Sequence, residues 1–155
     1  MWKYPYKTKP YDHQRAALNS SANENQWAYF MEMGTGKTKV TIDNFAYLYF
    51  KNKINAVLII APKSVYTIWE NEIETHIPND IKYKIFKWNI DKPKDYASLN
   101  KSKDFRIFLI NVEALSTKRG LDACADYLSK NTLNFVVLDE STTIKNRSAK
   151  RTKNI

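Results

Sequence analysis

Short apolar segments of strand length alternate along this chain with segments whose apolar residues recur every three or four positions. Several short segments are apolar and β-branched throughout, which is typical of strands buried on both faces of a sheet. This alternation favours an α/β fold with a parallel sheet that is flanked by helices. The predicted strands are 27–31, 54–61, 81–86, 106–112 and 134–138, and the predicted helices are 12–18, 37–49, 65–76 and 121–129.

The composition is that of an ordinary globular domain. The chain has 155 residues, of which 43% are hydrophobic and 26% are charged, so we expect one domain with a core of its own. The longest purely apolar run, 56–61, is far too short to span a bilayer, and no signal peptide is expected. The polar residues 89–104 are expected to form an exposed excursion between two strands.

The cysteine and histidine content limits the covalent and metal chemistry. Cys124 is the only cysteine, and with His13 and His76 it offers neither an internal disulfide nor a ligand set for structural zinc. This usage favours a reducing compartment such as a bacterial or infected-host cytoplasm. The abundance of Lys, Asn, Ile and Tyr is typical of an AT-rich genome, as in low-GC bacteria and their phages. Cys124 itself is expected to pack in a helix face.

Residues 27–38 join an apolar strand, a loop and the start of a helix. The loop holds Gly34 and Gly36, and Lys37 and Thr38 open the helix. Glycines let backbone N–H groups surround phosphate oxygens, and the helix N-terminus adds partial positive charge. Lys37 would reach the β- and γ-phosphates, and Thr38 would ligate Mg²⁺. The segment therefore predicts an ATP site, with nucleotide contacts from Met33, Gly34, Thr35, Gly36, Lys37 and Thr38.

Two adjacent acids, Asp139 and Glu140, follow the apolar strand 134–138. In α/β sheets ligands gather at the carboxyl ends of strands, which is where the phosphate loop also points. Asp139 would hold Mg²⁺, and Glu140 would orient and deprotonate the attacking water. Lys37, Asp139 and Glu140 are therefore the predicted catalytic residues. Because a carboxylate that activates water does not help a phosphotransferase, hydrolysis is favoured over kinase chemistry.

The charge is strongly positive and uneven. The formal net charge is +9, and five basic residues with no acid occupy the last eleven positions, so the rest of the chain carries only +4. Such a stretch is either a solvated terminus or a contact with a polyanion such as DNA. Lys145 and Arg147 are the predicted DNA contacts from this stretch.

Five segments carry motifs in a characteristic order: 10–14, 31–38, 61–65 with Trp69, 110–115 and 139–146. In this order they resemble the superfamily-two helicase-like ATPases of Swi/Snf type, over the first RecA-like lobe. The second segment is similar to the family's phosphate loop, which lacks the leading glycine of the general pattern; Met31 stands at that position here. The resemblance implies a three-layer P-loop fold with a mainly parallel central sheet.

The resemblance also implies residue roles. Gln14 would contact adenine, and the loop that holds Lys63 and Ser64 would contact the backbone of a DNA strand, which is expected to be duplex. Trp69 is expected to pack in the core rather than to contact DNA. Thr142 replaces a histidine that is frequent in relatives.

The second lobe and its arginine fingers are not in this sequence, so the chain is expected to be an incomplete first lobe, from either a fragment or a split gene. Such fingers contribute about 10³ to 10⁵ in rate, and the chain alone is expected to bind nucleotide and hydrolyse it poorly. Two alternatives stay open, which are a nucleotide-gated DNA-binding or assembly module without turnover and another small P-loop NTPase.

Overall fold

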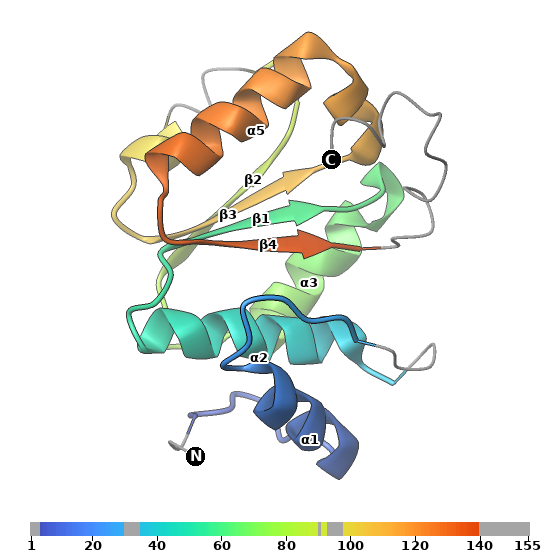
Figure 1. The fold of residues 1–155 in the computed structure, drawn as a ribbon, viewed down its shortest axis with the longest axis vertical. Coiled ribbons are helices and arrows are strands. Elements are labelled where there is room, and N and C mark those ends of the chain that lie inside the picture. Colours follow the sequence, from blue (N-terminus) through green and yellow to red (C-terminus); the bar gives the residue numbers. More distant parts are fainter. Residues whose placement is uncertain (1–3, 30–34, 90, 93–97, 140–155) are drawn as a thin grey trace. The chain divides into compact units, whose positions relative to one another are not determined.

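The computed structural model describes residues 4–29, 35–89, 91–92 and 98–139 of the chain (Figure 1). The chain forms two compact units, one of residues 1–53 and 67–82 and one of residues 54–66 and 83–155. The first unit is helical, and the second contains the sheet. Within the described residues, no helix is both long and apolar enough to cross a membrane.

The second unit is built on a sheet of four described strands that pair in parallel, in the order β2-β3-β1-β4 (Figure 1). The strands are β1 (Ala56–Ile60), β2 (Tyr83–Lys87), β3 (Phe105–Ile110) and β4 (Asn134–Leu138). The last residue of β1, Ile60, lies opposite Ile110 of β3 and Leu138 of β4. These strands therefore end together at one edge of the sheet, and their matching positions confirm the predicted parallel α/β pattern.

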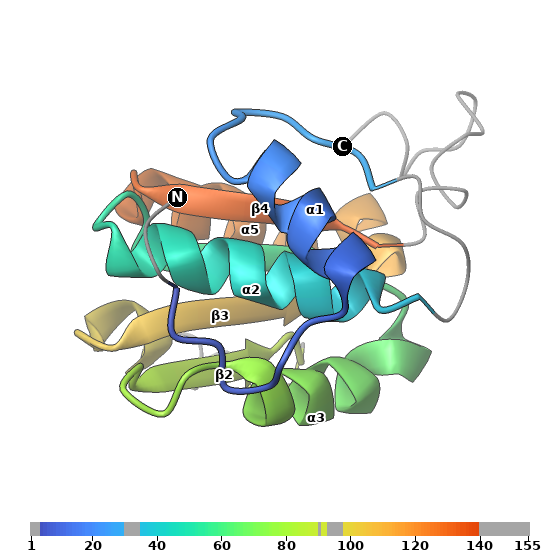
Figure 2. The ribbon, with the colours of Figure 1, turned by 90° about the horizontal axis from the view of Figure 1, so that it is seen from below.

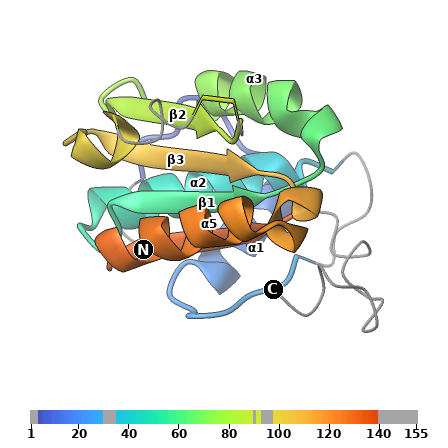
Figure 3. The same ribbon diagram turned by 90° about the horizontal axis from the view of Figure 1, so that it is seen from above.

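Helix α5 (Lys118–Lys130) covers one face of this sheet (Figure 3). Thr117 caps the helix, because its side chain accepts a hydrogen bond from the Gly120 backbone N–H. Gly120 is required by packing, since a Cβ there would collide with the carbonyl oxygen of Ala114 in the preceding 3-10 helix η2 (Val112–Ser116). The cap and the close approach fix the start of α5 beside the end of β3.

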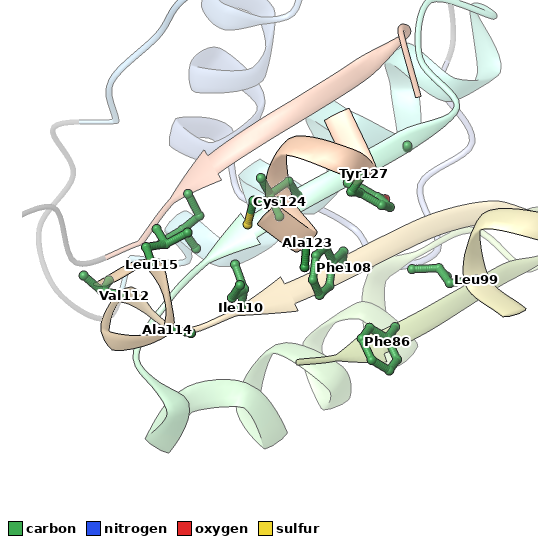
Figure 4. Close-up of a cluster of buried hydrophobic side chains, with 13 residues drawn as sticks. Phe86, Leu99, Phe108, Ile110, Val112, Ala114, Leu115, Ala123, Cys124 and Tyr127 are labelled. Atoms are coloured by element: carbon green, nitrogen blue, oxygen red, sulfur yellow. The ribbon is translucent and has the colours of Figure 1, made fainter. Parts of the chain in front are cut away.

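The core beneath α5 joins helix and sheet (Figure 4). Tyr127 is fully buried, and its ring packs edge-on against the Phe108 ring, with 5.1 Å between the ring centroids. Its hydroxyl lies 2.9 Å from the Val57 carbonyl oxygen and 3.1 Å from that of Arg106, so its one O–H is shared between two neighbouring strands. Cys124 points into the same cluster, as predicted, and burial raises the pKa of its thiol to about 12.

The first unit contains helices α1 (Asp12–Ser21), α2 (Lys37–Phe50) and nearly all of α3 (Tyr66–His76) (Figure 2). Helix α1 packs against α2, whose residues 39–47 are all buried. Tyr4 anchors the N-terminal segment, because its buried ring packs edge-on against Tyr47 and Phe50 of α2. This packing gives Tyr4 a structural role.

Two sequence expectations are corrected in the described residues. Of the strand predicted at 27–31, residues 27–29 form no strand: Trp27 is 50% exposed, and the Tyr29 hydroxyl bonds to Ser21 and Asn44 on α1 and α2. The excursion at 89–104 is not wholly exposed, because Leu99 is buried in the core under α5. Aromatic and apolar residues in these segments serve local packing, which a run-based prediction cannot distinguish from a strand or a solvated loop.

Candidate functional site: a phosphate loop beside a pocket

Gly36 ends the phosphate loop and caps the N-terminus of α2. Its φ of 86° is left-handed, a conformation that glycine adopts without strain. The first N–H groups of α2 have no acceptor inside the helix, and the dipole of this 14-residue helix makes its start electropositive. Lys37 and Thr38 lie in the first turn, and neither side chain bonds to another described residue. This end of α2 therefore has the donors that phosphate binding requires.

Gln14 braces the loop from α1. Its Oε1 accepts a hydrogen bond from the Tyr11 backbone N–H at 3.0 Å, and its Nε2 donates to the Thr35 carbonyl oxygen at 3.1 Å. The side chain is buried and packs so closely on Gly36 that a Cβ at Gly36 would collide with the amide. Both functions of the predicted adenine-contacting amide are thus used within the protein.

His13 provides a second brace that sequence reasoning missed. Its Nε2 lies 3.0 Å from the same Thr35 carbonyl oxygen, so Nε2 carries the proton, because a carbonyl only accepts. The imidazole stacks on the Tyr11 ring at 5.8 Å between centroids. Two consecutive residues of α1 therefore hold the residue before Gly36.

A pocket of about 580 Å³ lies beside this loop within the helical unit. It is lined by the N-terminal segment around Thr8, the start of α1, Gly36 and Lys39 of α2, and Glu72 and His76 of α3. The Lys39 ammonium forms an ion pair with Asp43 at 2.7 Å, and both side chains are buried. The pocket therefore adjoins the N-terminal end of α2 and has charged residues in its wall.

Asp139 and Lys63 lie at the carboxyl edge of the sheet in the other unit. Asp139 follows β4 directly, and its backbone N–H donates to the Ile60 carbonyl oxygen at 2.9 Å. Lys63 and Ser64 are exposed in the 3-10 helix η1 (Lys63–Val65), which follows β1. Asn111, after β3, accepts a hydrogen bond from the Tyr66 hydroxyl at 3.3 Å. The predicted metal-binding acid and two predicted DNA contacts thus share one edge of the sheet.

Several predicted site residues lie outside the described residues, and their roles stay predictions: Met33, Gly34, Glu140, Lys145 and Arg147. Within the described part of the chain, no group of three or more His, Cys, Asp or Glu side chains is placed to hold a metal ion. Thr38 and Asp139 offer hard oxygen donors, which suit Mg²⁺ bound together with phosphates and water. Trp69 is buried, as expected for a core residue.

The SNF2-related domain family profile matches residues 13–155. An uncharacterized ATP-dependent helicase of Mycoplasma pneumoniae is 33% identical over 123 residues, which cover 79% of this chain and 11% of that protein. The chromatin-remodeling ATPase INO80 of Saccharomyces cerevisiae is 30% identical over 135 residues, which cover 80% of this chain and 8% of the relative. The chain thus spans about a tenth of the length of these relatives.

A solved structure is similar over nearly the whole chain. The Sulfolobus solfataricus SWI2/SNF2 ATPase core in complex with dsDNA superposes with a TM-score of 0.72 and 23% identity, over 99% of this chain and 31% of that one. This similarity confirms the predicted RecA-like α/β fold. Because the family profile covers most of the sequence, the chain belongs to the SNF2-related domain family, a family of ATP-dependent helicases and ATPases.

Proposed function

We propose that this chain is the ATP-binding first lobe of a DNA-dependent ATPase that translocates on duplex DNA and hydrolyses ATP when joined to a second RecA-like lobe. The observation that carries the proposal is the Gly36-capped start of α2, which presents Lys37 and Thr38 beside a pocket of nucleotide size. Membership in the SNF2-related domain family supports the use of ATP.

Each residue of the proposed nucleotide site has a separate role. The N-terminal N–H groups of α2 and the Lys37 ammonium bind the β- and γ-phosphates, and Thr38 and Asp139 are the residues that would hold Mg²⁺. A bound Mg²⁺ would supply neutralisation of the charge on the transferred phosphoryl group. Glu140 takes a proton from the attacking water. These assignments are supported by residue type, by the position of each residue at the end of a strand or the start of a helix, and by the family.

Two other functions remain to be distinguished. A nucleotide-gated DNA-binding or assembly module would have the same ATP site without turnover. A small-molecule kinase would transfer the phosphoryl group to an acceptor, for which the water-activating Glu140 has no use. Release of inorganic phosphate that rises with duplex DNA supports the ATPase, whereas a phosphorylated small-molecule product supports the kinase.

The proposed DNA interface comprises the exposed basic residues at the carboxyl edge of the sheet and the basic terminal stretch. Lys63 and Ser64 are exposed on η1, and Lys118 and Arg119 are exposed at the start of α5, which follows β3 and η2. The dsDNA in the Sulfolobus solfataricus complex supports a duplex partner. Contacts of this kind bind backbone phosphates and read little base sequence.

This interface predicts a steep salt dependence. Each neutralised phosphate releases counterions, so the plot of log K against log salt has a slope of roughly −0.9 per contact on duplex DNA. We expect Lys63→Ala to make the slope shallower by about one contact, and removal of residues 147–155 to make it shallower by up to about four. Fluorescence anisotropy over a salt series measures both changes.

The matched control is Lys130→Ala. Lys130 is equally basic, but it lies at the opposite end of α5 and pairs with Asp126 at 3.1 Å. We expect the slope of log K against log salt for Lys130→Ala to equal that of the wild-type chain. If Lys63→Ala and Lys130→Ala change the slope equally, the carboxyl edge is not the DNA interface. An unchanged slope after removal of residues 147–155 would assign that stretch to solvent.

A further inference from the structure

The pocket beside the phosphate loop contains polar groups that are already occupied. Gln14 uses both of its amide functions, as described above. The Lys39 ammonium is held by Asp43, by the Thr8 carbonyl oxygen at 3.2 Å and by the face of the Tyr6 ring at 5.4 Å. These bonds orient the Gln14 amide, which keeps one N–H and one lone pair for a ligand, and they direct the Lys39 ammonium into the protein. Another group in the wall can add to the recognition of a ligand.

Glu72 has an available carboxylate oxygen. Its Oε2 lies 3.1 Å from the His76 Nε2, while its Oε1 has no hydrogen bond to any residue that the structure describes. The side chain is 38% exposed and lines the pocket. An ionised carboxylate only accepts hydrogen bonds, so this oxygen suits a ligand group that carries N–H or O–H.

A chain of hydrogen bonds fixes Glu72 in this position. Because the carboxylate accepts, the proton is on Nε2 of His76, and the neutral ring then accepts at Nδ1 from the Thr8 hydroxyl at 2.6 Å. Burial, together with the nearby Lys39 charge, lowers the pKa of His76 and keeps the ring neutral. Thr8 and His76 thus orient Glu72 from behind, in the way that outer groups orient a functional side chain.

The elements that line the pocket differ in charge. The start of α2 beside Gly36 attracts phosphate, whereas the carboxylate of Glu72 repels it, so a nucleotide with its phosphates at Lys37 would place its nucleoside toward α3. We propose that Glu72 is a specificity-determining residue that accepts a hydrogen bond from the nucleoside, through the ribose 2′-hydroxyl or the exocyclic amine of adenine, with His76 and Thr8 as positioning residues. This inference rests on the proposed function.

The test compares the dissociation constants of three nucleotides for the 155-residue chain with Mg²⁺. MgATP offers both donors, 2′-deoxy-ATP lacks one ribose hydroxyl, and purine riboside triphosphate lacks the amine. A hydrogen bond to a charged group corresponds to a preference of about 10- to 100-fold, so the wild-type chain should bind the analogue without the contacted donor that much more weakly. In Glu72→Ala the dissociation constant of that analogue should become about equal to that of MgATP. The ratio between the other analogue and MgATP should stay unchanged.

Four further variants separate recognition from structure. Glu74→Ala removes the same charge from the same helix outside the pocket and should keep the wild-type ratios. Thr8→Val removes the hydroxyl that orients His76 and should lower the preference, whereas Thr8→Ser should retain it. Glu72→Gln keeps the size and one acceptor oxygen, so it should retain part of the preference and serves if Glu72→Ala is poorly folded.

The outcomes distinguish this inference from the function on which it rests. Suppose that the wild-type chain binds MgATP and that Lys37→Ala abolishes this binding. If Glu72→Ala then lowers the affinity for all three nucleotides by the same factor, or leaves all three unchanged, the inference is overturned and the ATP site stands. If the wild-type chain prefers neither donor, the inference is likewise overturned. If the wild-type chain does not bind MgATP, the proposed function fails and this inference fails with it.

Discussion

Replacement of Lys39 by methionine should lower the free energy of unfolding by about 3–5 kcal/mol at pH 8. Lys39 and Asp43 form a buried ion pair at 2.7 Å, with side chains that are 7% and 3% exposed. Methionine fills much of the same volume but leaves the carboxylate buried without its counter-charge. The uncompensated charge, rather than a cavity, causes the expected loss.

The expected loss depends on pH because burial raises the pKa of Asp43 from 3.8 to about 6, although Lys39 opposes the rise. The folded state then binds the proton more tightly than the unfolded state, so Asp43 makes the fold less stable as pH rises from about 4 to about 6. Without Lys39 the pKa of Asp43 rises further, and the pH range over which the fold loses stability extends upward. The deficit of Lys39→Met should therefore be smaller at pH 5 than at pH 8.

Urea denaturation of wild type and Lys39→Met at both pH values measures this difference. The matched control is the double variant Lys39→Met with Asp43→Asn, which removes both charges and should recover much of the lost stability. A loss below about 1 kcal/mol that is equal at both pH values would contradict a buried ion pair at this position.

Replacement of Glu140 by glutamine should reduce ATP turnover by about 100-fold or more, while MgATP binding is kept. The amide can hydrogen-bond the attacking water but cannot take its proton. The measurement is steady-state phosphate release, with and without duplex DNA, in a protein that carries this chain together with a second lobe. Asp139→Asn is the companion variant, and it should also weaken the dependence on Mg²⁺. Turnover of Glu140→Gln near the wild-type value would mean that another group is the base.

The sequence predicted elements whose signals are local. The run of apolar residues at 134–138 corresponds to β4 residue for residue, and the predicted helix start at Lys37 coincides with the start of α2. Strand-length runs and a glycine before a helix depend on neighbouring residues alone, which explains these agreements. The burial of β4 was less predictable: Val136 and Leu138 are 46% and 43% exposed, because among the described strands β4 pairs only with β1.

The contacts that the sequence could not predict join distant residues. Thr8 and His76 form a hydrogen bond although they are 68 positions apart in the sequence, and neither residue belongs to a recognisable motif. The same holds for the bond from His13 to the Thr35 carbonyl oxygen, which depends on how α1 packs against the loop. Gln14 was predicted as an adenine contact from its motif, but the motif does not indicate that both ends of its amide bond within the protein. Tertiary packing decides such contacts.

Calorimetric titration of MgATP into the wild-type chain and Lys37→Ala tests the central claim most directly. The account predicts one site in the wild-type chain and an affinity that is roughly 30-fold or more weaker in Lys37→Ala, because the loop loses the cation that faces the terminal phosphates. The matched control is Lys51→Ala, which removes an exposed lysine just beyond the other end of α2 and should leave the affinity unchanged. Equal MgATP affinity in the wild-type chain and Lys37→Ala would contradict nucleotide binding at this loop.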